Sequence, residues 1–148
     1  MSGLLQHLPS DIVRHLINDK GEGTLPSLNG AWPVFATKLP DVPDEALCVY
    51  DSESLLEGRT MTNGETQEHY GIQVRLRAVS PAIGYHKAHL LASRMDLNVL
   101  RDLVTLEGIP YLVHAITRRG GILPIGPESG STIRVGFTIN FTASIRQQ

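Results

Sequence analysis

The chain has 148 residues, a length that favours a single domain able to bury about 70% of its unfolded surface. Its hydrophobic content of 41% is ordinary for a globular protein, and no apolar run approaches the roughly 20 residues of a membrane-spanning helix. The formal net charge of −2 gives no indication of nucleic-acid binding through overall charge. The first residues lack a basic region and are interrupted by Pro9, so we expect no signal peptide.

Charge is distributed unevenly along the chain. Residues 41–68 carry eight acids and one base, whereas residues 69–148 carry nine bases and four acids. Such a split predicts two oppositely charged surfaces, which meet within one chain or between neighbouring copies. A patch that fits a different patch on the next copy makes a head-to-tail contact, which closes into a ring or grows a filament. A solvated acidic loop without a partner is the alternative.

A helix is predicted near the N-terminus, with Ser10 as its N-cap and Gly21 as its C-cap. Its apolar stripe consists of Ile12, Val13, Leu16 and Ile17. A short strand is expected over residues 33–39, with Trp32 and Phe35 as candidate anchors. These two elements open the predicted fold.

The segment "LPDVPDEALCVYDSE" (39–53) contains five acids, which could be metal ligands or the polar rims of a strand. Its apolar centre "ALCVY" predicts a strand, which at about 3.3 Å per residue would hold the two acidic groups ~17 Å or more apart. One ion cannot collect ligands over that distance, and the spacing of a calcium loop is absent. We therefore interpret the acids as turns and rims. Residues 51–68 then predict a long loop or an extended hairpin arm.

Residues 70–78 alternate between apolar and polar side chains, which predicts a half-buried strand with Arg75 and Arg77 on its polar face. A second helix follows, because Ser80 is a good N-cap and Pro81 stands at the first helical position, where proline is favoured. Residues 96–102 are expected to form a turn or a ragged helix end.

Residues 103–116 predict two short strands around the turn at Glu107–Gly108. A glycine- and proline-rich loop is expected at about 118–131, and residues 133–145 alternate as the strongest strand of the chain. The polar face of this last strand carries Arg134 and Arg146. Together these elements predict an α+β fold with a four- to five-stranded, mostly antiparallel sheet and two helices packed on one face.

Few residues point to catalysis, and we expect no cofactor. His86 and His89 lie three residues apart on the predicted second helix, a spacing that can share a metal, but no third ligand is apparent. Surface histidines are the favoured interpretation, and a small metal-dependent enzyme is a remote alternative. The single cysteine, Cys48, lies in an apolar strand, which predicts a buried thiol and suits a reducing compartment.

Three segments, in this order and spacing, carry a resemblance to a known family. The turn "LPDVPD" (39–44) introduces a strand that ends in Tyr50–Asp51, "IQVRLR" (72–77) runs into a helix, and "FTINF" (137–141) lies in the closing strand. Over residues 1–146 the chain resembles the tail-terminator, or tail-completion, group of minor capsid proteins of long-tailed bacteriophages. It departs from the group in the acidic segment after Asp51, where family members often have a glycine- and proline-rich turn.

The resemblance implies a virion protein without enzymatic activity, made in the host cytoplasm. Proteins of this group form a ring, usually of six subunits, on the head-proximal end of the tail tube. The ring stops growth of the tube protein and presents a surface to the head–tail connector or head-completion protein. DNA passes through its lumen without specific binding. Another head–tail connector or head-completion protein is the alternative, and neither binds a membrane.

Eight charged residues are candidates for the contact between subunits. The acidic candidates are Glu53, Glu57, Glu65 and Glu68. The basic candidates are Arg75, Arg77, Arg134 and Arg146. The arginines could instead line the lumen or pair within the chain.

Overall fold

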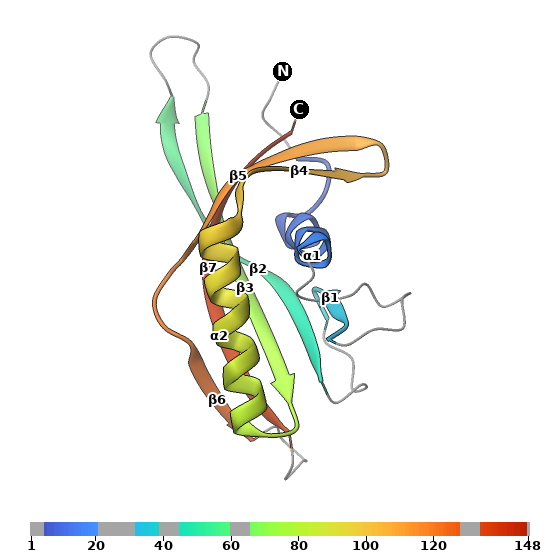
Figure 1. Cartoon of the computed structure of the whole chain (residues 1–148). Coiled ribbons are helices and arrows are strands. Elements are labelled where there is room, and N and C mark those ends of the chain that lie inside the picture. Colours follow the sequence, from blue (N-terminus) through green and yellow to red (C-terminus); the bar gives the residue numbers. More distant parts are fainter. Residues whose placement is uncertain (1–4, 21–31, 39–44, 60–65, 128–133, 148) are drawn as a thin grey trace.

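The chain folds as an α+β domain with a mixed, mostly antiparallel sheet (Figure 1). The computed structural model describes residues 5–20, 32–38, 45–59, 66–127 and 134–147. The elements are α1 (Pro9–Asp19), β1 (Val34–Ala36), β2 (Ala46–Arg59), β3 (Thr66–Ala78), α2 (Pro81–Asn98), β4 (Leu100–Leu106), β5 (Ile109–Arg118), β6 (Leu123–Pro127) and β7 (Val135–Gln147).

Among the described residues the sheet has seven strands, so the prediction of four to five was too low. The strand order is β1-β2-β3-β7-β5-β4, β6 also pairs with β7, and β1 runs parallel to β2. β6 lies inside the segment for which the sequence predicts a loop. The prolines at 124 and 127 favour that prediction, since proline is rare in strands. These prolines are tolerated because β6 pairs with β7 alone of the described strands, and proline is accepted in such edge strands.

β3 and β7 form the centre of the sheet. The alternation predicted for residues 70–78 is confirmed, since Tyr70, Ile72, Val74, Leu76 and Ala78 are all buried. They stand opposite the apolar positions of β7, with Ile72 paired to Phe141 and Val74 to Ile139. Both helices lie on this face of the sheet, and their apolar side chains complete a single buried cluster (Figure 1).

The sheet curls around α1, which contacts β1 and β2 on one side and β4 on the other (Figure 1). An ion pair of 2.9 Å between Lys20 Nζ and Asp102 Oδ2 ties the end of α1 to β4. Residues 96–102 were expected to form a turn or a ragged helix end; α2 does end there, at Asn98, but β4 already starts at Leu100. The predicted turn at Glu107–Gly108 is confirmed, with φ of 51° and 80° as a two-residue hairpin requires.

α2 begins as the sequence predicted. Ser80 is its N-cap, and the Ser80 hydroxyl accepts a hydrogen bond of 3.1 Å from the backbone N–H of Ile83. The helix then approaches the sheet closely at Gly84, where a Cβ atom would lie 2.5 Å from a ring carbon of Phe137. Glycine at this position allows α2 to lie directly on β7.

Candidate subunit interface

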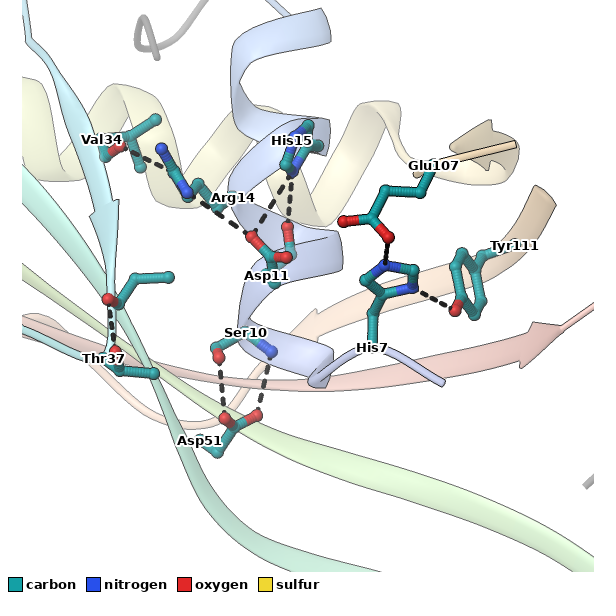
Figure 2. Close-up of polar contacts among 11 residues, drawn as sticks. His7, Ser10, Asp11, Arg14, His15, Val34, Thr37, Asp51, Glu107 and Tyr111 are labelled. Carbon is teal, nitrogen blue, oxygen red and sulfur yellow. Dashed lines mark hydrogen bonds and ion pairs between the residues drawn. The ribbon is translucent and has the colours of Figure 1, made fainter. Parts of the chain in front are cut away.

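Asp51 joins β2 to the N-terminus of α1 (Figure 2). Its carboxylate accepts hydrogen bonds from the Ser10 backbone N–H (2.9 Å) and the Ser10 hydroxyl (2.7 Å). The N-cap position is occupied by Leu8, which makes no side-chain cap, so the prediction of Ser10 as N-cap was wrong. A carboxylate from a distant strand takes over the capping role, and its negative charge suits the positive end of the helix dipole.

Three further contacts hold residues 7–14 against the sheet (Figure 2). The His7 ring nitrogen Nδ1 lies 2.6 Å from the hydroxyl of Tyr111, and its Nε2 lies 3.7 Å from the Glu107 carboxylate. On α1 itself, Arg14 Nε donates a 3.0 Å hydrogen bond to the carbonyl of Val34. α1 is thereby connected to β1, β2 and the β4–β5 hairpin.

The opposite side of the sheet is covered by neither helix, and we call it the helix-free face. In β2, β3 and β7 its described members are Ala46, Cys48, Tyr50, Ser52, His69, Gly71, Gln73, Arg75, Arg77, Gly136, Thr138, Asn140, Thr142, Ser144 and Arg146. None of these side chains is acidic.

A polar row crosses the helix-free face over three strands. Arg75 Nε donates to Gln73 Oε1 at 3.1 Å, and Gln73 Nε2 donates to Asn140 Oδ1 at 3.3 Å. The Arg75 guanidinium carbon lies 5.2 Å from the ring centre of Tyr50, within cation–π range. These contacts fix the direction of an exposed cation.

The four candidate arginines do not form one patch. Arg75 is exposed, whereas Arg77, two residues later on the same polar face, is only 3% exposed. Arg134 is partly buried just before β7. Arg146 is exposed, but it lies eight residues along β7 from Thr138, the partner of Arg75, or roughly 26 Å at about 3.3 Å per residue.

The acidic candidates belong to a hairpin arm. β3 pairs with β7 only from His69 onward, and beyond that point the hairpin continues as residues 53–59 of β2, in which Leu56 pairs with Glu68 and Arg59 with Thr66, and residues 66–68 of β3. We call these two stretches the acidic arm; Figure 1 shows it projecting past the helices. Glu65 lies outside the described residues, as do the side chains of Glu53, Glu57 and Glu68.

The arm and Arg75 are at different ends of the sheet. Glu68 precedes Arg75 by seven residues in β3, a separation of roughly 23 Å at about 3.3 Å per residue. The structure therefore does not bring the arm acids and Arg75 together within one chain.

Two exposed apolar residues of β6 were not predicted from the sequence. Leu123 is 54% exposed and Ile125 is 56% exposed. Leu123 pairs with Thr138, and Ile125 lies over Gly136, so both belong to the helix-free face beside Arg75. Their spacing of two residues was the available signal, which the surrounding glycines and prolines obscured.

The histidines and the cysteine that the sequence offers for metal binding or catalysis lie on different elements, α2 and β2. His86 and His89 are exposed on α2, and the His89 ring stacks on Tyr85 with 6.4 Å between centroids. Within the described part of the chain, no group of three His, Cys, Asp or Glu residues could hold a metal. Cys48 is buried, and burial raises the pKa of its thiol, although a hydrogen bond with Tyr50 and the charge of Arg75 oppose this.

Comparisons with known proteins identify no family. No family model matches the chain, and no curated protein matches it. One solved structure, whose name describes no function, is similar over 96% of this chain and 97% of its own, with 15% identity and a TM-score of 0.47. A likeness of this degree assigns neither a family nor a function. Across the described residues, no helix has the length and apolarity to cross a membrane.

Proposed function

We propose that this protein is a tail terminator of a long-tailed bacteriophage: a structural virion protein that forms a ring on the head-proximal end of the tail tube. The supporting observation is that the segments resembling this group belong together in space. The strands that follow "LPDVPD" and contain "IQVRLR" and "FTINF" are β2, β3 and β7, three neighbours in the sheet. Asp51 of the Tyr-Asp pair caps α1. The segments that carry the resemblance therefore lie in one contiguous part of the structure.

The separation of charge also supports a ring. The acidic arm and Arg75 lie at different ends of the sheet, so opposite charges are available to neighbouring copies. A contact between two different surfaces of the same chain repeats from copy to copy and closes when the rotation allows it.

The test is the length of tail tubes. The purified chain is added to the polymerising tube protein of the same phage, and tube lengths and ends are measured in micrographs. A terminator shortens the tubes in proportion to its concentration and places a ring on one end. Tubes of unchanged length with bare ends would refute the proposal. Binding to portal-bearing heads instead of tubes would favour the other candidate, a head–tail connector or head-completion protein.

A further inference from the structure

Four neighbouring residues give one end of the helix-free face the composition of a protein-binding surface. They are Tyr50, Arg75, Leu123 and Ile125, and we call them the Arg75 patch. Tyrosine and arginine are, with tryptophan, the side chains enriched at the energetic centres of interfaces. Here they adjoin two exposed aliphatic side chains, while Asn140 and Gln73 supply polar groups beside them.

The geometry of the Arg75 patch is set by β7. Thr138 pairs with Arg75 on one side and with Leu123 on the other, which puts these two residues about 10 Å apart across three strands. Gly136 leaves room for Ile125, whose Cδ1 would lie 3.4 Å from a Cβ there. Since Gln73 and Tyr50 already hold the guanidinium, binding costs little side-chain entropy.

The exposed charge of Arg75 favours an acidic partner for the patch. No described side chain of the helix-free face in β2, β3 or β7 is acidic, so Arg75 has no carboxylate partner there. The chain itself supplies an acidic element: the arm contains Glu53, Glu57 and Glu68 against one base, Arg59. Glu53, the arm acid nearest to Arg75, follows Cys48, the β2 partner of Arg75, by five residues, or about 17 Å along the strand. Glu68 is roughly 23 Å from Arg75 along β3, so the arm of one chain does not reach its own patch.

We propose that the Arg75 patch binds the acidic arm of a second copy of this chain. The inference deepens the proposed ring by naming its contact, and it selects Arg75 over Arg77, Arg134 and Arg146. Each copy has one arm and one patch at different ends of the sheet, so every copy can bind two neighbours. The charged part of the contact weakens with salt, since the screening length falls from about 10 Å at 0.1 M to about 3 Å at 1 M.

The first experiment measures the mass of the purified chain by light scattering over concentration and salt. We expect Arg75→Glu and Ile125→Asp each to weaken self-association by about tenfold or more, as removal of a central interface residue does. The matched controls are Arg94→Glu and Ile83→Asp, which make the same changes at exposed positions of α2, on the other side of the sheet. The controls should assemble like the wild type.

The second experiment uses charge exchange. One variant carries Glu53→Lys, Glu57→Lys and Glu68→Lys, which reverses the arm, and the other carries Arg75→Glu, which reverses the patch. Each alone should self-associate at least about tenfold more weakly than the wild type. Their equimolar mixture should recover assemblies, because the reversed arm matches the reversed patch and the two unchanged surfaces match each other. Circular dichroism melting of each variant checks that the fold is retained.

The outcomes separate this inference from the proposed function. A wild-type chain that stays monomeric at high concentration in low salt, an Arg75→Glu variant that assembles normally, or a mixture that does not recover would each overturn the inference. If the chain caps tubes but assembles without the Arg75 patch, the proposed function stands and the proposed contact is refuted. If the chain self-associates through the Arg75 patch but has no effect on tubes, the contact stands and the proposed function is refuted.

Discussion

Both faces of the central sheet contain buried residues, but only one face is covered by helices. On the helix-covered face, apolar residues of β3 and β7 are buried under α1 and α2. On the helix-free face, Cys48, Arg77 and Thr138 are also nearly inaccessible, although no helix covers them. Burial therefore does not by itself distinguish a core from a surface, and the chemistry of the neighbours has to be considered. The helix-covered face should dominate stability, and the helix-free face should dominate association.

The sharpest test compares two adjacent residues of β7. Phe141→Ala removes a side chain that is 1% exposed in the helix-covered core, and we expect a loss of about 3–5 kcal/mol in the free energy of unfolding. Thr142→Val, on the helix-free face, should change it by no more than about 0.5 kcal/mol. Urea denaturation of both variants gives the two values. Similar losses for the two substitutions would contradict the assignment of the core to one face.

Gly84 tests how closely α2 lies on that core. Gly84→Ala adds a methyl group 2.5 Å from the Phe137 ring, and such overpacking typically costs about 1–3 kcal/mol. The gain of about 1 kcal/mol in helix propensity opposes this cost. We expect net destabilisation in thermal unfolding, with partial recovery when Phe137→Leu is added. A stabilised Gly84→Ala variant would show that the helix and strand are farther apart.

Asp51 is a polar residue on the helix-covered face. Asp51→Ala removes the cap of α1 and should cost about 1–2 kcal/mol of unfolding free energy. Ser10→Ala should cost less, because the backbone N–H of residue 10 keeps its bond to the carboxylate. Denaturant melts of both single variants and the double variant measure the coupling. The control, Ser52→Ala, is exposed on the other face and should be neutral; an equal loss there would argue against capping.

The smallest expected signal concerns Cys48 on the helix-free face. Because burial raises the pKa of this thiol, less thiolate is present at any given pH below that pKa than for an ordinary cysteine. Alkylation by iodoacetamide at pH 8 should therefore be much slower in the folded chain than in urea, and should follow unfolding. Mass spectrometry of timed samples measures it. Rapid labelling of the native chain would show that this part of the face is open.

The helix-covered half of the molecule was largely predictable. Three features follow from neighbours along the chain: the period of two in residues 70–78, the same period in the closing strand, and the Ser80–Pro81 start of α2. The structure contains all three elements. The α+β class and the two helices follow from the same local patterns. Local sequence is sufficient wherever an element's own side chains decide its conformation and the face it buries.

Tertiary structure decided the remainder. The cap of α1 comes from Asp51, forty-one residues beyond Ser10. β6 forms because β7 offers an edge for a segment rich in glycine and proline, and Arg77 is buried while Arg75, two residues earlier, is exposed. The sequence determined which residues carry charge and which alternate. Only folding determined which charges share an end of the sheet, because strand register brings together residues that sequence spacing does not relate.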